Sequence, residues 1–390
     1  MPSKQHESPL FTSIDWSDRQ RSALDVRPRT VGFVAALAGL AALFVYDYTM
    51  VSGAIVDTWI LNRMDWLFFL TCVLFVRYAV VPLAANADQS SGTVRAFLRR
   101  PAGVASAAWI AAFGVLGLVG PELLGMPRVD FYADYQPPVF TSIGIASNAG
   151  VDCVGRVTEG VCHGSWQYPL GTTSVGEDMV NVIMYGAHIA LKLSIAAAMI
   201  MVVVATAVGT TAGYFGGWVD DVLMRYVDVQ QTIPAIVVYI IVATMYLGKG
   251  LFTLALIFGL LNWGGIARLV RSETLERRES GYVRAARSAG ASDLHVIRRH
   301  LVPNSTATVV TALTRQIPLL ILVQVLLAYL QLNTVRLRSL GGILRRSLPP
   351  FGMGWWVAAG VTAFLVLTVL SFNVFGDVVR DVLDPHEGVA

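Results

Sequence analysis

Few side chains in this 390-residue sequence have the type and spacing that chemistry requires. The three cysteines form no CxxC pair and the six histidines form no HExxH motif, so the common zinc-binding patterns are absent from the sequence. The nearest approach to a Walker nucleotide motif, Gly248-Lys249-Gly250, lacks the first Gly and the final Ser or Thr of GxxxxGK[ST]. We therefore expect a non-catalytic chain with no metal site and no bound cofactor.

Lys192 is the most unusual charged residue, because it lies about five residues, or ~8 Å, into the apolar stretch 187–214. A Lys or Arg at the centre of a membrane span costs roughly 2.5–3.5 kcal/mol on insertion scales. Two interpretations stay open: Lys192 faces a translocation path and attracts a substrate carboxylate, or it extends to the outer headgroups. Arg77 and Arg315 also lie in apolar stretches, where we expect them to extend to headgroups or to pair with other helices.

Composition indicates the kind of protein that must position these side chains. Hydrophobic residues make up 55% of the sequence, charged residues only 14%, and the mean hydropathy is +0.60. Typical soluble domains contain about 25% charged residues. We therefore expect an all-α polytopic membrane protein. The net charge is only +3 and the basic residues lie in short segments between apolar runs, so no nucleic acid is expected as a partner.

Eight stretches are apolar enough to cross a bilayer, which takes about 20 residues. They run over 31–48, 66–85, 102–120, 187–214, 222–247, 251–269, 307–332 and 355–375. Pro234 and Pro318 lie inside two of them and should kink the helices there. The first 30 residues are polar and carry no signal-peptide pattern, so we expect the first span to stay as an anchor.

The distribution of basic residues predicts the orientation. With the N-terminus inside, 18 Lys and Arg fall in inner segments and eight fall in outer segments. We therefore expect the N-terminal tail, residues 1–30, and the C-terminal tail, residues 386–390, on the cytoplasmic side of the cell membrane. The polar segment 121–183 then lies outside, where an oxidising environment permits a disulfide between Cys153 and Cys162. Two free thiols are the alternative.

One inner segment is too long and too regular for a simple connector. It runs over 268–304, holds eight Arg, and carries apolar or small residues on one helical face. These residues are Val283, Ala286, Gly290, Leu294, Ile297 and Leu301. We expect Gly290 to divide the segment into two short helices and Pro303 to prevent continuation toward the next span. Two interpretations stay open for such a basic amphipathic hairpin: contact with anionic lipid headgroups, or docking on a soluble partner.

The same segment resembles the EAA loop of ATP-binding-cassette (ABC) importer permeases. That pattern consists of EAA, three residues, Gly, nine residues and I-x-L-P. The matching stretch here is Tyr282-Val283-Arg284-Ala285-Ala286, then Gly290, then His300-Leu301-Val302-Pro303-Asn304. Arg284 stands in place of the Glu, His300 in place of the Ile and Val302 in place of the Leu.

Further motifs resemble the dipeptide/oligopeptide family of these permeases, and the PLGT segment is typical of its C-type subunit. The matching stretches are Tyr168-Pro169-Leu170-Gly171-Thr172 with Gly176-Glu177-Asp178, Tyr185-Gly186-Ala187-His188-Ile189, Ala212 to Asp220 with Met224-Arg225, Ala267-Arg268-Leu269-Val270-Arg271, and Phe372-Asn373 through Leu383-Asp384-Pro385. Together they extend over about 168–385, a little over half of the chain.

The resemblance implies a six-helix type I importer core with two extra N-terminal helices. The extra pair lies in 31–101, the first core helix is 102–120, and the permease core is 184–385. The segment after the seventh span carries four Arg between Arg336 and Arg346, departs from the family pattern and stays unassigned. Lys192 departs as well, because the family pattern is apolar at that position.

The resemblance also implies the partners of the chain. These are a B-type permease subunit in a heterodimer, two ABC ATPase subunits that bind ATP and Mg, and an extracytoplasmic substrate-binding protein, with membrane lipid around the helices. The stretch 282–304 would couple ATPase closure to the pore, with Ala286 and Gly290 as points of close contact. The segment 121–183 would meet the binding protein. Di- and oligopeptides are the implied substrates, and related members carry nickel, opines or sugars.

Two other classes of function stay open as alternatives. An ion-coupled secondary transporter would be expected to show paired acids or broken helices near the membrane midplane. A membrane-embedded enzyme would need a nucleophile, a base or metal ligands at membrane depth. The sequence shows no acidic pair and no such constellation there. Co-purification with two ATPase subunits would distinguish an importer from both.

Overall fold

The structure is a computed structural model that describes residues 28–50, 61–81, 87–144, 153–333, 339–346 and 354–383. The chain divides into two compact units, residues 1–58 and 59–390, and each is described by itself. The first unit contains α1 (Pro28–Met50), an apolar helix of 23 residues in which none of the described side chains is buried. Its length and composition agree with the predicted first span.

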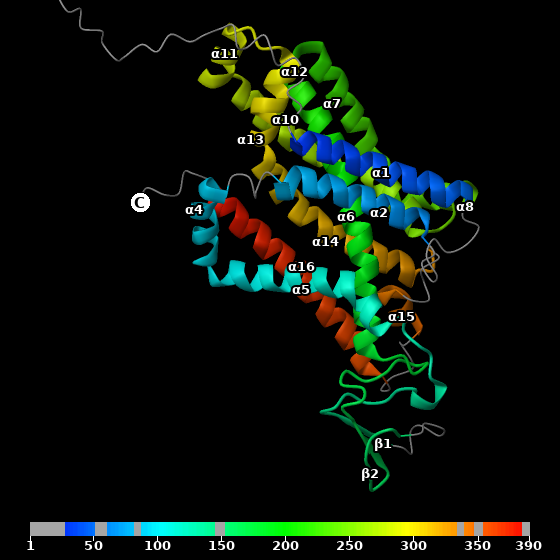
Figure 1. Cartoon of the computed structure of the whole chain (residues 1–390). Coiled ribbons are helices and arrows are strands. Elements are labelled where there is room, and N and C mark those ends of the chain that lie inside the picture. The colour runs from blue at the N-terminus through cyan, green and yellow to red at the C-terminus, as the bar shows by residue number, and fades with distance from the viewer. Residues whose placement is uncertain are drawn as a thin grey trace, which may run out of the picture. The chain divides into compact units, whose positions relative to one another are not determined.

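The second unit is built mainly from helices and carries one small antiparallel sheet (Figure 1). Its elements are α2 (Arg63–Phe75), η2 (Val76–Val80), α4 (Ala87–Leu98), α5 (Pro101–Leu124), η3 (Phe131–Ala133), β1 (Ser142–Gly144), β2 (Val157–Thr158), β3 (Val161–His163), α6 (Met179–Phe215), α7 (Gly217–Thr232), α8 (Ala235–Met245), α9 (Leu251–Leu261), α10 (Gly264–Arg278), α11 (Gly281–Ser288), α12 (Asp293–Val296), η5 (Ile297–Leu301), α13 (Val302–Asn304), α14 (Thr306–Tyr329), α15 (Leu340–Arg346) and α16 (Trp355–Leu383).

The candidate membrane spans agree with most of the predicted ones. Among the described residues, six helical stretches are long and apolar enough to cross a bilayer: α1, α5, α6, α9 with α10, α14 and α16. The bent pair α7 and α8 makes a seventh if it is counted as one span. The predicted span 66–85 is not among them. Its described part consists of α2, which carries the charged Arg63 and Asp65 in its first turn, and the π-helical turn η2, which follows α2 directly. Residues 82–86 lie outside the described part, so the count of eight stays a prediction.

Helix α6 is the element around which the second unit packs. It has 37 residues, or ~55 Å, and contacts α2, α5, α7, α9, α10 and α14. The helix begins after Asp178, whose carboxylate accepts a hydrogen bond from the backbone N of Val180 at 3.0 Å. Close packing against α10 requires a glycine, because a Cβ on Gly209 would lie 2.5 Å from the carbonyl oxygen of Ala267.

The two prolines inside predicted spans behave differently. Helices α7 and α8 meet at Pro234 with a bend of 73°, which confirms the kink predicted there. Helix α14, in contrast, contains Pro318 and is one helix of 24 residues.

The basic inner segment begins later than the sequence predicted. Helix α10 continues to Arg278, so residues 268–278 are helical rather than part of a connecting loop. Two of its arginines pair with acids of α7: Arg268 with Asp228, and Arg271 with Asp220 at 2.5 Å. We use the name hairpin for residues 279–305, which follow α10 and precede α14.

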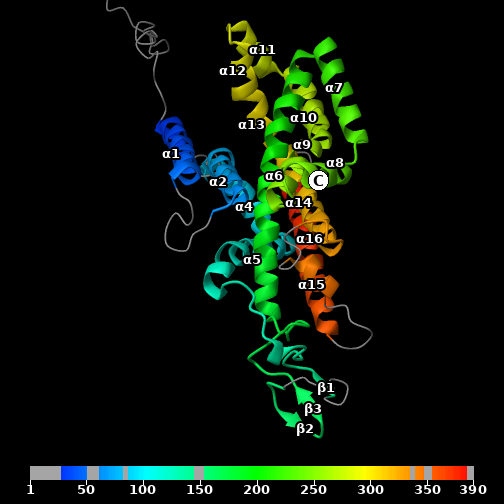
Figure 2. The same cartoon turned by 90° about the vertical axis from the view of Figure 1, so that its right-hand side faces the viewer.

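Residues 125–144 and 153–178 form a cap at the opposite end of α6 from the hairpin (Figures 1 and 2). Its three strands are antiparallel in the order β1-β3-β2. The side chain of Gln136 is buried, and its backbone N donates to the hydroxyl of Thr172 at 2.8 Å. Arg346 of α15 contacts buried Glu177 at 3.3 Å, so an ion pair joins the base of the cap to the helices.

Candidate functional site

The hairpin consists of two helical arms joined at Gly290. Helix α11 ends in a turn in which the backbone N of Gly290 donates to Arg287 O at 2.9 Å, and that of Ala291 donates to Ala286 O at 3.0 Å. Gly290 has a φ of +81°, in the left-handed region that glycine adopts without strain. The helix break predicted at Gly290 is therefore present.

The expected break at Pro303 is wrong. The second arm is helical through α12, η5 and α13, and only Ser305 separates it from α14. The π-helical turn η5 ends at Leu301, and α13 follows it directly at Val302. Pro303 lies in the first turn of α13. A proline is tolerated there because its missing N–H has no obligatory acceptor in a first turn.

The apolar stripe of the hairpin faces inward, against the end of α6. Val283, Val296 and Leu301 are fully buried and pack around Tyr214, which is 5% exposed. Leu294, which the sequence placed on this stripe, is 55% exposed. The left-handed turn at Gly290 changes the direction of the helix, so a helical period counted across it gives the wrong face.

Residues predicted for coupling therefore divide between two faces. Val283, Ala286, Ile297 and Leu301 pack in the inner cluster. Tyr282, Arg284, Ala285, Gly290, Leu294 and Pro303 are exposed.

Tyr214 fixes the hairpin to α6, and the sequence interpretation gave it no role. Its hydroxyl donates to the carboxylate of Asp293 at 2.6 Å, and the guanidinium of Arg287 lies 4.6 Å from the centre of its ring. One residue earlier, the carbonyl oxygen of Gly213 accepts a hydrogen bond from Arg278 at 3.0 Å. Both arms of the hairpin are thus attached to the last turn of α6. Tyr214 stands in the Ala212 to Asp220 motif, but its contacts depend on folding of the hairpin.

Lys192 is paired inside the chain, with a partner from the extra N-terminal region. Its Nζ lies 2.5 Å from Oδ1 of Asp65, at the start of α2, and the two side chains are 21% and 9% exposed. Asp65 also accepts a hydrogen bond from the backbone N of Asn62 at 3.0 Å. Helix α6 begins at Met179, so Lys192 lies 13 residues, or ~20 Å, along it, rather than five residues into it.

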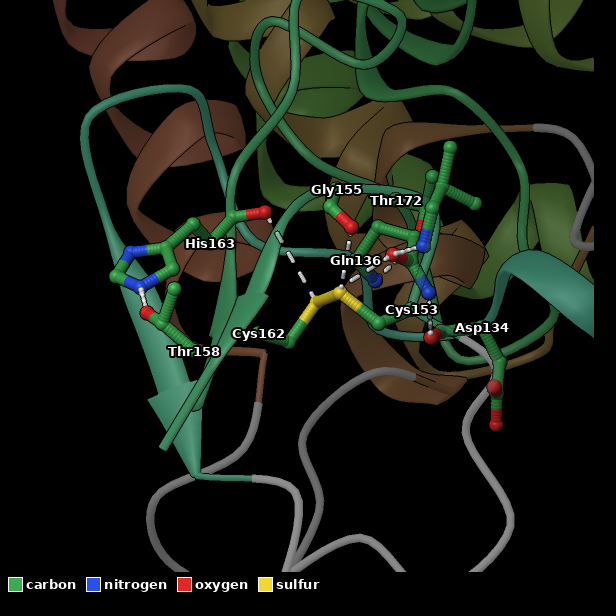
Figure 3. The surroundings of a disulfide bond; sticks show 9 residues. Asp134, Gln136, Cys153, Gly155, Thr158, Cys162, His163 and Thr172 are labelled. Carbon is green, nitrogen blue, oxygen red and sulfur yellow. Dashed lines mark hydrogen bonds between the residues drawn. A yellow bond between two sulfur atoms is a disulfide. The ribbon is translucent and has the colours of Figure 1, made fainter. Parts of the chain in front are cut away.

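Cys153 and Cys162 are joined by a disulfide in the cap, with Cα atoms 5.8 Å apart (Figure 3). Cys162 belongs to β3, and Cys153 lies in the segment before β2. Between the two cysteines, the backbone N of Val154 donates to the side-chain oxygen of Gln136 at 2.9 Å. Their oxidation in the cell stays a prediction.

Among the described residues, no group of three His, Cys, Asp or Glu is placed to hold a metal ion.

Two further arginines that the sequence left open pair between helices. Arg315 of α14 contacts Asp377 of α16 at 3.4 Å. Arg345 donates to the carbonyl oxygen of Tyr329 at 3.2 Å. Arg336 and Arg338 lie outside the described residues.

The hairpin, residues 279–305, lies inside the part of the chain that matches a known family. Residues 205–388 match the family model of the binding-protein-dependent transport system inner membrane component. The chain belongs to this family of non-catalytic ABC permeases, in its dipeptide/oligopeptide branch.

Three relatives illustrate the similarity. The dipeptide permease DppC of Bacillus subtilis is 33% identical over 55% of this chain and 68% of its own length. The oligopeptide permease OppC of the same organism is 31% identical over 55% and 70%. The glutathione permease GsiD of Pectobacterium atrosepticum is 32% identical over 59% and 75%. Permeases named for three different substrates thus resemble this chain to a similar degree.

Proposed function

We propose that this chain is the C-type permease subunit of an ATP-driven importer and forms half of a translocation path for di- or oligopeptides. The relatives named for peptides support this substrate class, and the glutathione permease extends it to a modified tripeptide. The other half of the path would come from a B-type permease subunit. Two ABC ATPases would supply ATP hydrolysis, and an extracytoplasmic binding protein would deliver the substrate.

The observation that carries this proposal is the attachment of the hairpin to α6. A connector that served only to join two spans would need no buried contacts of its own. Here Tyr214 holds both arms of the hairpin through its ring and its hydroxyl. A displacement of the hairpin would therefore move α6, which extends to the cap. A packed joint of this kind suits a rigid-body switch between two states of the pore.

The proposal also assigns the two ends of α6 to the two sides of the membrane. The hairpin would lie in the cytoplasm, as the excess of basic residues predicts. The cap would lie outside, where the Cys153–Cys162 disulfide is stable and where a binding protein would dock. The N- and C-termini would both be cytoplasmic.

The exposed turn of the hairpin is the proposed point of close approach to an ATPase. A Cβ placed on Gly290 would have no atom within 4 Å, so the space outside the turn is open in this chain. Ala286 lies on the inner side with Tyr214, so the proposed approach involves Gly290 and its exposed neighbour Ala289. A bulky residue at Gly290 itself would strain the left-handed turn, so Ala289 is the better position for a test.

The test is Ala289→Trp in the reconstituted importer, with Ala289→Ser as the control of similar size. The tryptophan variant should lose the stimulation of ATP hydrolysis by loaded binding protein, while the serine variant retains it. Full stimulation in the tryptophan variant would refute docking at this turn. Uptake by the chain alone, without ATPase subunits and with dependence on an ion gradient, would refute the importer assignment.

A further inference from the structure

The eight arginines between positions 268 and 304 divide into two groups according to their partners. Five interact within the chain: Arg268, Arg271, Arg277 and Arg278 with acids of α7, α10 or the hairpin, and Arg287 with the ring of Tyr214. The other three, Arg284, Arg298 and Arg299, are exposed and have no ion-pair partner among the described residues.

The hairpin cannot neutralise these three charges with its own acids. Residues 279–305 contain only two acidic residues, Glu279 and Asp293. Glu279 pairs with Arg278 at 3.1 Å, and Asp293 accepts the hydroxyl hydrogen bond of Tyr214. The outer face of the hairpin therefore carries uncompensated positive charge.

Two of the free arginines border an open groove of about 360 Å³ on the second arm. Its lining residues are Ser292, Leu294, His295, Arg298 and Arg299. Leu294 is 55% exposed, so the groove has one apolar contact surrounded by basic and polar side chains. Such a surface fits a partner that presents one apolar side chain beside carboxylates.

A lipid surface is a poorer match than a protein. A helix that lies on a bilayer buries its apolar face in the headgroup region. In this hairpin the apolar face, formed by Val283, Val296 and Leu301, is already buried against Tyr214. The outer face offers lipid no comparable apolar stripe, because Leu294 stands there among basic and polar side chains, whereas a protein surface with complementary groups would use the charges and Leu294 together.

We propose that the ATPase surface that receives this hairpin is acidic, with carboxylates opposite Arg284, Arg298 and Arg299 and an apolar residue opposite Leu294. The inference rests on the proposed function, since it defines the chemistry of the partner at the same docking site. It follows from the charges of this chain, where Arg284 occupies the position that the EAA pattern gives to an acid.

The first experiment measures ATPase binding to the whole permease heterodimer in nanodiscs of zwitterionic lipid. The variant Arg284→Gln/Arg298→Gln/Arg299→Gln should bind the ATPase roughly 10- to 100-fold more weakly, since three exposed ion pairs are lost. The control is Arg128→Gln/Arg156→Gln, which removes two exposed arginines of the cap and should bind as the parent does. Single Arg298→Gln, expected to weaken binding about threefold, covers the case in which the triple variant does not fold.

A second experiment identifies the partner groups directly. The chain contains only three lysines, Lys4, Lys192 and Lys249, so new lysines give a low background in carbodiimide cross-linking. Arg298→Lys and Arg299→Lys should form amide cross-links to Asp or Glu side chains of the ATPase, read by mass spectrometry.

The outcomes separate this inference from the proposed function. If the parent binds the ATPase but the Gln variants bind equally well and the Lys variants give no cross-link to it, the acidic partner surface is refuted and the importer assignment stands. If the Gln variants lose function only in nanodiscs with anionic lipid, the arginines serve the membrane and the inference is again refuted. If the parent binds no ATPase in either lipid, the proposed function itself fails.

Discussion

The ion pair between Lys192 and Asp65 should make the extra helix α2 part of the folded core. Lys192→Met removes the positive charge from α6 and leaves the carboxylate of Asp65 with its single hydrogen bond from Asn62. Asp65→Asn leaves Lys192 without its counter-ion while it preserves the shape of the side chain. Each single change should therefore destabilise the chain.

The magnitude follows from the burial of the pair. Exposed ion pairs contribute about 0.2–1 kcal/mol, whereas removal of one partner from a buried pair costs about 3–5 kcal/mol. With side chains only 21% and 9% exposed and a separation of 2.5 Å, this pair lies near the buried limit. We expect about 3 kcal/mol for Lys192→Met, which corresponds to a fall in the unfolding midpoint of roughly 4 °C for a chain of 390 residues.

A double-mutant cycle measures the interaction itself. The double variant Asp65→Asn/Lys192→Met removes both charges, so its cost should be about 2 kcal/mol smaller than the sum of the two single costs. In the assay, the detergent-purified chain is heated to a series of temperatures. Size-exclusion chromatography then measures the folded fraction that remains after each temperature. Lys192→Arg, which keeps the charge, is the control and should lose less than Lys192→Met.

Two results would refute the reasoning. One is an unchanged midpoint for Lys192→Met, which would mean that the lysine is solvated rather than paired. The other is strict additivity of the two single variants, because independent residues show no coupling energy. A loss of substrate transport in Lys192→Met at full stability would instead support the alternative that Lys192 contacts substrate.

Three further outcomes test other parts of the structure. Tyr214→Phe should keep the chain assembled but lower substrate-stimulated ATP hydrolysis severalfold relative to basal hydrolysis, because the hydrogen bond from the hydroxyl to Asp293 of α12 is lost. An unchanged ratio of stimulated to basal hydrolysis would contradict the proposed coupling of the hairpin to α6 through Tyr214. Gly209→Leu should destabilise the chain by about 2 kcal/mol or more through a clash with α10, and a midpoint equal to that of the parent would contradict the packing. A mass increase after reduction and alkylation should reveal the bond of Cys153 to Cys162, whereas alkylation of the two thiols without prior reduction would exclude it.

Much of the helical architecture can be predicted from the sequence because it depends on local pattern. Long apolar runs give the spans, Pro234 gives the bend between α7 and α8, and Gly290 gives the turn of the hairpin. Each of these features depends on the hydropathy or backbone preference of residues that are adjacent in the chain.

The features that the sequence did not provide depend on contacts between distant residues. Arg268 and Arg271 resembled the start of a polar loop, but acids of α7 neutralise them and α10 continues. Asp65 and Lys192 are 127 positions apart, so their pairing requires α2 to be packed against α6. The exposure of Leu294 follows from a change of direction at Gly290 that helical periodicity does not include.

The unbroken length of α6 has a mechanical consequence. A continuous helix of 37 residues that is fastened to the hairpin at one end and to the cap at the other acts as a lever. If it pivots near one end, a tilt of about 10° displaces the other end by ~10 Å, given a length of ~55 Å. Small angular changes at the hairpin end would thereby be amplified into larger displacements at the cap, and in the proposed importer the same helix would connect the ATPase side of the chain with the side that meets the binding protein.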